Sequence, residues 1–410
     1  MPHSPRSMNQ CSETARARDL SSTILSFHPA QNSWGVGLLG KVGIILLPSN
    51  ENAASCYLLD LMEQSDLGSA GRPWANAYIA HVRALSPIWR ASSFTATEAA
   101  DWAGFLMAEG LVSARSRTPM VVTSQDQLLL SGPEPPSLET LLSSLENSAN
   151  DSSLSFLWAS MRPYMFHATR LSRQMYDTIT GDFARINPLS EVAVRNLIDS
   201  LSKLRSILDL LLDRVDMVTT PPGSNAPTIL DDSSIDAVAR ASAYGVCFGF
   251  SGLVLPFYRE LQYRETIDST PQSERTRARM QALRAQAHDM AVLGLRELAR
   301  GIRFLPKIHY SPVHWPTIRA WAEFAAEEAD MEGRGPLSPE AARDLETVAD
   351  EMKLLGYSVD TASTPQTHAL IERLEGHINQ ALVSMFLPIT ENAWPVDDGI
   401  IADGGELILP

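Results

Sequence analysis

The feature that most constrains the fold is the spacing of apolar residues between Glu191 and Asp216. Residues of this stretch recur at alternating intervals of three and four: Val194, Leu197, Leu201, Leu204, Leu208, Leu211 and Val215. The spacing predicts a helix with one continuous apolar side, and it also fits a coiled-coil seam. Further apolar residues widen that side: Ile198, Ile207, Leu210 and Leu212. We therefore favour an internal bundle helix, with a homodimer seam as the alternative.

Prolines punctuate the other stretches that have helical spacing. The stretch from Gly71 to Trp89 predicts a helix broken at Pro87, with these residues on its apolar side: Trp74, Tyr78, Val82 and Leu85. Leu154 to Thr180 predicts a helix interrupted near Pro163. Later helices are expected to begin at Pro339 and Pro365, because proline is favoured in the first turn. We expect an all-α fold, a single large irregular helical domain with proline-punctuated helices.

Two long helical stretches have alternative interpretations. Ala241 to Tyr258 carries no charged residue, as a membrane span would require, but Arg240 and Arg259 bracket it and glycines lower its hydropathy. We favour a helix buried on all sides. Ser273 to Lys307 predicts a basic amphipathic helix, whose arginines we expect to pair with neighbouring carboxylates: Arg275, Arg277, Arg279, Arg284, Arg296, Arg300 and Arg303.

The net charge, the cysteine positions and the N-terminal segment argue against several classes of protein. The 410 residues carry a formal net charge of −15, which argues against general nucleic-acid binding because phosphate contacts need clustered basic residues. Cys11, Cys56 and Cys247 are too far apart for a disulfide framework or a cysteine-rich zinc module. They fit a reducing compartment. The N-terminal segment has no apolar stretch of the kind a secretion signal needs.

Three patterns resemble sites but lack the required context. Gly35, Gly37 and Gly40 form a G-x-G-x-x-G pattern before Lys41, but no strand precedes them, so we favour a small-residue helix from Trp34 to Pro48. The second pattern is a group of aspartates, Asp231, Asp232 and Asp236. The third is a pair of histidines, His309 and His314. The aspartates loosely resemble the magnesium motif of all-α terpenoid synthases, but helix capping explains them better. The histidines lack further ligands for a tetrahedral metal site. We predict no catalytic, cofactor-binding or metal-binding residue, and no cofactor.

The stretch from Thr95 to Gly132 predicts a helix, a turn and an extended segment. Thr95 and Glu98 have the spacing of a capping box. The helix that follows has an apolar side that we expect to be buried, formed by Trp102, Phe105, Leu106 and Val112. Asp101 and Glu109 are expected on its other sides. Pro119 should end the helical geometry and leave residues 120–123 extended and strand-like, as the start of an extended segment that ends at Gly132 and Pro133.

This stretch resembles the signature of the fungal transcription-factor regulatory domain, the all-α middle homology region that follows a zinc binuclear cluster. The resemblance rests on the spacing of Glu98, Trp102, Phe105, Glu109, Ser113, Arg117, Pro119, Asp126 and Leu130. The chain departs from the signature at Ala99, Ala100 and Asp101, which replace basic residues, and at Gly110, which replaces the basic member of an acidic-basic pair.

The resemblance implies a layout and a function. Residues 1–29 would be a frayed N-terminus, residues 30–388 the regulatory domain, and residues 389–410 an acidic-hydrophobic tail, either an activation segment or a strand on the domain. The protein would be a nuclear regulator of transcription without its own DNA-binding module, either truncated or stand-alone, with the cytoplasm as the alternative location. It would bind protein partners of the transcription machinery, a DNA-binding subunit or a small-molecule effector. It would not be an enzyme, and it would bind neither nucleic acid nor membrane directly. The alternative is an all-α enzyme of the terpenoid-synthase kind that uses Mg²⁺ and a prenyl diphosphate.

Overall fold

The computed structural model describes residues 43–65, 72–92, 96–131, 134–148, 154–219, 233–267, 273–304, 314–331, 337–358 and 363–386. Within these ranges the regular structure is helical and no strand occurs, so the predicted all-α class is confirmed. The expected N-terminal and C-terminal segments, residues 1–29 and 389–410, lie outside the described residues. Among the described helices, no segment combines the length and the hydropathy that a membrane crossing requires.

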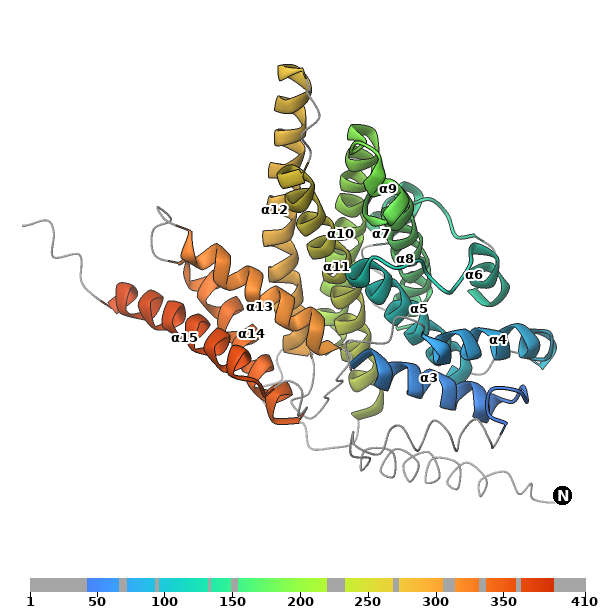
Figure 1. The fold of residues 1–410 in the computed structure, drawn as a ribbon. Coiled ribbons are helices and arrows are strands. Elements are labelled where there is room, and N and C mark those ends of the chain that lie inside the picture. The colour runs from blue at the N-terminus through green and yellow to red at the C-terminus, as the bar shows by residue number, and fades with distance from the viewer. Residues whose placement is uncertain are drawn as a thin grey trace, which may run out of the picture. The chain divides into compact units, whose positions relative to one another are not determined.

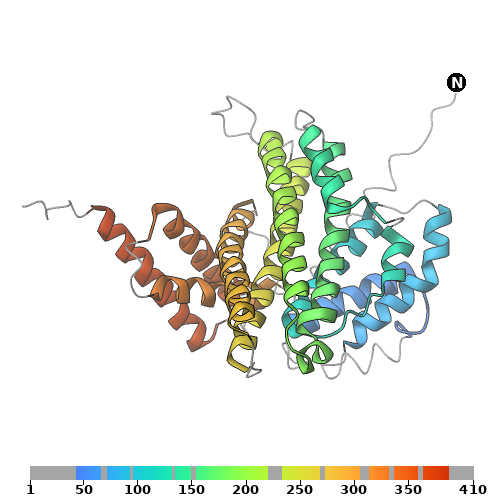
Figure 2. The same ribbon diagram turned by 90° about the horizontal axis from the view of Figure 1, so that it is seen from above.

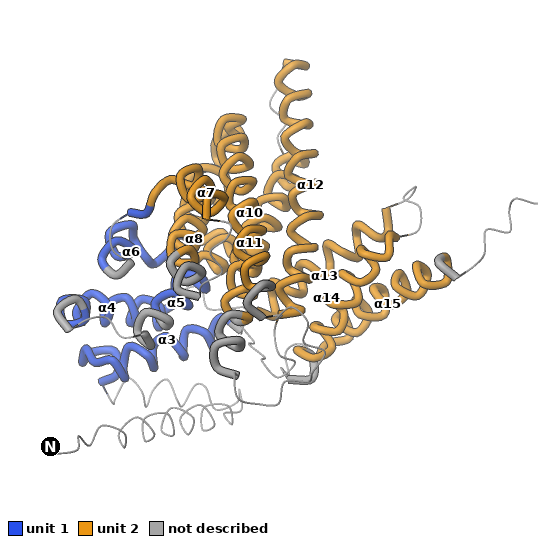
Figure 3. Tube along the Cα trace, turned by 180° about the vertical axis from the view of Figure 1, so that it is seen from behind, with its two compact units in different colours: residues 1–109, 119–135 blue, residues 110–118, 136–410 orange. Residues whose placement is uncertain are grey.

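The chain divides into two compact units, coloured separately in Figure 3. Unit 1 contains residues 1–109 and 119–135, and unit 2 contains residues 110–118 and 136–410. The helix α5 (Ala96–Ser116) therefore contributes residues to both units. The boundaries predicted for the helical domain, residues 30 and 388, stay a prediction.

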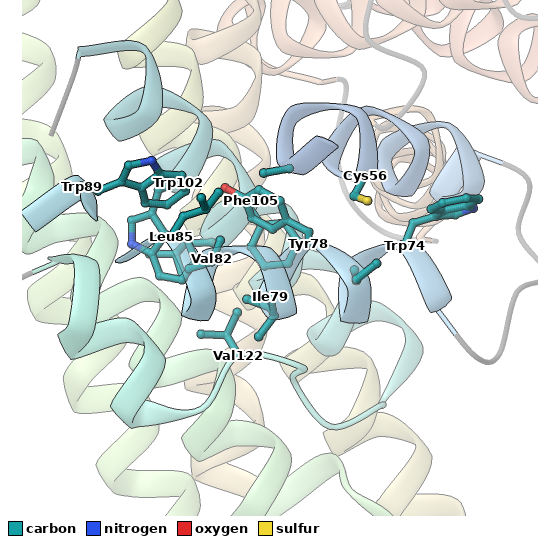
Figure 4. Packing of buried hydrophobic residues seen from close by; sticks show 14 residues of the cluster. Cys56, Trp74, Tyr78, Ile79, Val82, Leu85, Trp89, Trp102, Phe105 and Val122 are labelled. Carbon is teal, nitrogen blue, oxygen red and sulfur yellow. The ribbon is translucent and has the colours of Figure 1, made fainter. Parts of the chain in front are cut away.

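Unit 1 is built from α3 (Asn50–Ser65), α4 (Pro73–Ser92), the first part of α5 and α6 (Ser124–Ser131). Its core is aromatic: the ring of Phe105 lies 4.4 Å from that of Tyr78 and 6.1 Å from that of Trp102 (Figure 4). The predicted buried residues of α4 and of this part of α5 all lie in the core. The large apolar area that these rings remove from water is the main source of the stability of the unit.

Two predictions about local structure in unit 1 are wrong. Residues 43–47 form a turn instead of the end of a helix, because Gly43 has a φ of +78°, outside the right-handed helical region. The helix α4 also continues past Pro87 to Ser92. Proline lacks the N–H that would bond to the carbonyl of Arg83, but the hydroxyl of Ser86 donates to that carbonyl oxygen at 3.1 Å. The hydrogen bond from Ser86 therefore lets the helix accommodate the proline.

Unit 2 contains a bundle of long helices that run alongside one another in Figure 2, in colours from green to gold. These are α8 (Leu154–Met175), α10 (Glu191–Thr219), α11 (Ser233–Ile267) and α12 (Glu274–Phe304), with α7 (Leu138–Asn147) packed beside α10. The helix α8 continues through Pro163, contrary to prediction, because burial of its Met161, Tyr164 and Phe166 holds it in the bundle.

The helix α10 confirms the interpretation of its apolar spacing. All residues of the predicted seam are buried within unit 2, and so are Ile198, Ile207 and Leu212. The helix therefore has a wide buried side, as an internal bundle helix does. Likewise, α11 places most of its uncharged stretch from Ala241 to Tyr258 in the core.

Four of the arginines of α12 pair with carboxylates of neighbouring helices. Arg279 contacts Glu191, Arg284 contacts Glu265, Arg300 contacts Asp213 and Arg303 contacts Asp344, at N–O distances of 3.1, 3.2, 3.3 and 2.5 Å. The expected pairing is thus confirmed for these four. The expected apolar side of α12 is also buried.

The C-terminal part of unit 2 is a group of three helices, drawn in orange to red in Figure 1. They are α13 (Trp315–Asp330), α14 (Pro339–Ser358) and α15 (Pro365–Phe386). The last two begin at the predicted prolines. The hydroxyl of Ser338 accepts a hydrogen bond from the N–H of Ala341, and the hydroxyl of Thr364 accepts one from the N–H of Thr367, both at 3.2 Å, so both helix starts are capped.

Candidate functional site

The segment that carries the family resemblance is helical on both sides of a short turn. Residues 118–123 form the turn, and α6 begins at Ser124, so the predicted extended segment is wrong. The reason is a capping motif at the start of α6; Thr95, the first residue of the capping box expected at the start of α5, lies outside the described residues. The hydroxyl of Thr123 accepts from the N–H of Asp126 at 3.2 Å, and the carboxylate of Asp126 accepts from the N–H of Thr123 at 2.9 Å. These reciprocal hydrogen bonds start a helix where the sequence analysis expected extended geometry.

Glu109 lies at the centre of a buried network in unit 1. The prediction that Glu109 lies off the buried side of α5 is wrong, because its side chain is fully buried. One oxygen, Oε1, accepts from the N–H of Val121 in the turn, and the other accepts from Arg72. Arg72 also donates to Asp60 at 3.0 Å, and Gln64 donates to the same oxygen of Asp60 at 2.5 Å. The network therefore joins α3, the start of α4, α5 and the turn within unit 1.

The backbone of Arg72 adopts an unfavourable conformation, which persists only because the surrounding contacts hold the residue in place. Its φ is +38°, in the left-handed region that costs about 1–2 kcal/mol for a residue with a side chain. Burial by itself lowers the pKa of the guanidinium, but the charges of Glu109 and Asp60 outweigh burial and raise it. One positive charge thus faces two buried carboxylates, and the guanidinium is the group that makes their burial tolerable.

A second charge pair fixes the start of α6. Arg83 donates from Nε and Nη2 to the two carboxylate oxygens of Asp126, at 2.7 and 2.8 Å. Burial raises the pKa of Asp126, but the hydrogen bonds from Arg83 and Thr123 outweigh it and lower the pKa to about 2. Asp126 therefore stays ionised, and it holds α4 and α6 together within unit 1.

The part of the signature in unit 2 ends α5. The buried hydroxyl of Ser113 donates to the carbonyl oxygen of Thr118 at 2.7 Å. Arg117, between them, has a φ of +54°, which places it at the left-handed position that commonly terminates a helix. Ser113 and Arg117 thus stop the helix just before Pro119, which could not continue it.

These contacts show what the signature residues do. Trp102 and Phe105 fill the core, while Glu109, Ser113 and Asp126 bond to the backbone that follows α5. Side chains of this kind position a turn. The side chains of Glu98 and Leu130 lie outside the described residues.

Of the other candidates from the sequence, only Asp236 and His314 lie within the described residues. Gly35, Gly37, Gly40, Lys41, Asp231, Asp232 and His309 lie outside the described residues, and Asp236 belongs to the first turn of α11. His314 is hydrogen-bonded through Nδ1 to the hydroxyl of Tyr244 at 2.7 Å, and burial lowers its pKa to about 4. Its ring packs against Tyr244 and Phe248, so its role is structural.

The described part of the chain holds no cluster of three or more histidine, cysteine, aspartate or glutamate side chains arranged to bind a metal. Cys56 and Cys247 are buried and unpaired with each other. Burial raises the pKa of the Cys56 thiol to about 11 and raises that of Cys247 further. Neither is a ready nucleophile, because the thiolate is the reactive form.

The residues that sequence reasoning missed are Asp60, Arg72 and Arg83. Asp60 stands inside the apolar sequence of α3, a position where a buried charge needs a partner. That placement was a usable signal for a buried ion pair. Nothing in the sequence identified Arg72 as its partner.

The comparisons with known proteins add no identification. No protein-family model, no curated protein and no solved structure matches this chain.

Proposed function

We propose that the protein is a regulator of transcription that lacks its own DNA-binding module and acts by binding a partner or a small molecule through its helical domain. The proposal rests on the resemblance of residues 98–130 to the fungal regulatory-domain signature. One structural observation supports it. Glu109, Ser113 and Asp126 each bond to the backbone of the segment after α5, so the polar residues of the signature serve architecture, as a family signature without catalytic chemistry would.

The proposed location is the nucleus, with the cytoplasm as the alternative. In either place the protein needs a DNA-binding subunit as partner, since its net charge of −15 disfavours phosphate contacts of its own. The prenyl-diphosphate enzyme has no comparable support: it depends on Asp231 and Asp232, which lie outside the described residues.

The proposal is tested by tethering. The full chain is fused to a heterologous DNA-binding domain and expressed in a fungal host with a reporter gene downstream of the matching DNA site. We expect reporter transcription to change, up or down, relative to the DNA-binding domain alone. A fusion with Arg72→Gln should lose the effect if the fold of unit 1 is required, whereas Arg319→Gln, which removes a partly exposed intrahelical pair in α13, should keep it.

A negative result is informative only if the fusion protein is folded. Circular dichroism of the purified fusion protein establishes this. A folded fusion that leaves the reporter unchanged would refute the proposal. Magnesium-dependent turnover of a prenyl diphosphate by the purified chain would replace it with the enzymatic alternative.

A further inference from the structure

Glu297 of α12 carries a buried carboxylate in the helical bundle of unit 2. The residue is 4% exposed. Its Oε1 atom lies 3.6 Å from Nη2 of Arg205 on α10, which is longer than a hydrogen bond, and its Oε2 atom has no hydrogen-bond donor among the described residues. A carboxylate removed from water in this way is costly while it is ionised, whereas the protonated acid is neutral.

Close packing of α12 against α11 fixes the position of Glu297. One turn after it, a Cβ atom at Gly301 would lie 2.6 Å from the Cβ atom of Cys247, so the two helices touch there. Just before it, the carbonyl oxygen of Gly294 accepts a hydrogen bond from the hydroxyl of Ser251 at 3.2 Å. The backbone on both sides of Glu297 is thus held against α11, and exposure of its carboxylate would require these contacts to break.

The positive charges near Glu297 are shared with other carboxylates. Arg205 also lies 3.5 Å from Asp209 on its own helix, and Arg300 of α12 lies 3.3 Å from Asp213 of α10. Across this contact between α10 and α12, the described residues supply three carboxylates and two arginines. One proton would neutralise the group.

The titratable groups that face Glu297 from the other two helices stay neutral. Tyr164 of α8 and Cys247 of α11 interact with it electrostatically, and burial raises the pKa of both. Burial also raises the pKa of Glu297, the charge of Asp209 raises it further, and the neighbouring arginines offset these effects only in part. The pKa of Asp209 is raised as well, chiefly by burial. The folded chain therefore favours a proton at this contact.

We propose that Glu297 is a proton-controlled contact of the bundle: it binds a proton in the folded chain, and loss of that proton weakens the packing of α12 against α10. Because its folded-state pKa lies above the ordinary value of 4.5, its contribution to stability is complete below pH 4.5 and is lost as pH rises through the folded-state pKa. The bundle should therefore be tighter in mildly acidic than in alkaline solution. This inference goes beyond the proposed function and does not depend on it.

Infrared difference spectroscopy of the purified full chain, titrated from about pH 4.5 to about pH 8, detects the proton directly. We expect a carboxylic-acid band that persists above pH 4.5 and disappears as pH rises further. Glu297→Gln should lose this band. Glu346→Gln, which alters an exposed side chain of α14, is the matched control and should keep it.

Hydrogen exchange followed by mass spectrometry measures the effect on packing. After correction for the intrinsic pH dependence of exchange, peptides from α10 and α12 should lose protection as pH rises. The loss should be about tenfold for each unit by which the folded-state pKa exceeds the ordinary value. Glu297→Gln imitates the protonated acid and should keep its protection at every pH, whereas Glu346→Gln should behave as the unaltered chain does.

Two neighbouring variants distinguish a proton-controlled contact from a structural one. Asp209→Asn removes a like charge and should move the titration of the acid band to lower pH. Arg205→Gln removes a counter-charge and should move it to higher pH. Circular dichroism verifies that each variant is folded.

Several outcomes would overturn the proposal: an acid band that Glu297→Gln retains, protection of α10 and α12 that does not depend on pH, or the same pH dependence in Glu297→Gln. If Glu297→Gln did not fold, the shifts in Asp209→Asn and Arg205→Gln would decide, and shifts that are absent or in the same direction would refute the proposal. These assays contain no DNA and no reporter, so their failure is distinct from failure of the proposed function.

Discussion

The contacts of Asp126 constrain its protonation directly. Its pKa in the folded chain is about 2, below the ordinary value of 3.8. A carboxylate with a lowered pKa stabilises the fold above its unfolded-state pKa, and the contribution disappears as pH falls through its folded-state pKa. The pair with Arg83 therefore contributes fully above about pH 4, and the contribution is lost as pH falls toward 2.

We predict that Asp126→Asn lowers the free energy of unfolding by about 1 kcal/mol at neutral pH, because the half-exposed Arg83 is screened by solvent. The difference from the unaltered chain should shrink between about pH 4 and pH 2 and then vanish. Urea unfolding followed by circular dichroism measures it. Asp289→Asn, whose side chain is 80% exposed, should show no comparable difference. A loss that is constant down to pH 2 would contradict the assignment.

Arg72 and Arg83 provide a direct comparison of buried and exposed pairing. Arg72→Gln leaves the buried carboxylates of Asp60 and Glu109 without their counter-charge, so we expect a loss of about 3–5 kcal/mol in unfolding free energy. Arg83→Gln should cost about 1 kcal/mol or less. Urea unfolding of the two variants in the same buffer tests the ranking, and equal losses would show that the buried network is not the stronger element.

At the scale of elements, α4 shows how a helix accommodates a proline. If the hydroxyl of Ser86 replaces the missing N–H of Pro87, Ser86→Ala leaves the carbonyl of Arg83 without that donor. We expect a loss of about 1 kcal/mol in unfolding free energy. In a Pro87→Ala background the new amide should serve the carbonyl, and Ser86→Ala should cost little. The double-mutant cycle measures this coupling, and strict additivity would refute it.

The elements that the sequence predicted well are those in which local signals agree with burial. The helix α10 has a regular apolar side, and α14 and α15 each begin with a capping hydroxyl followed by proline. Three of the errors, at Pro87, Pro119 and Pro163, arose where proline was taken as decisive. Packing and a serine hydroxyl carried α4 past Pro87, and the reciprocal caps of Thr123 and Asp126 started α6 close behind Pro119.

For the whole molecule, the net charge limits binding to DNA. The chain carries −15, and non-specific affinity for DNA comes from neutralising phosphates with basic groups. We predict that the full chain alone does not bind labelled duplex DNA at protein concentrations on the order of 10 µM in low salt, where weak non-specific binders are detected. Fluorescence anisotropy measures this. Sequence-specific binding by the isolated chain would overturn the proposed dependence on a DNA-binding partner.

Local signals in the sequence were enough to predict the all-α class, the buried sides of α4, α10 and α12, and the aromatic residues of the unit 1 core, because apolar periodicity and caps are local properties. Which charges are buried and paired depends instead on how the helices pack. Arg72 meets Glu109 across 37 positions of the chain, and Arg185 meets Glu260 across 75. Such partners are brought together by packing of the helices, and a carboxylate is tolerated in the interior only when that packing supplies its counter-charge.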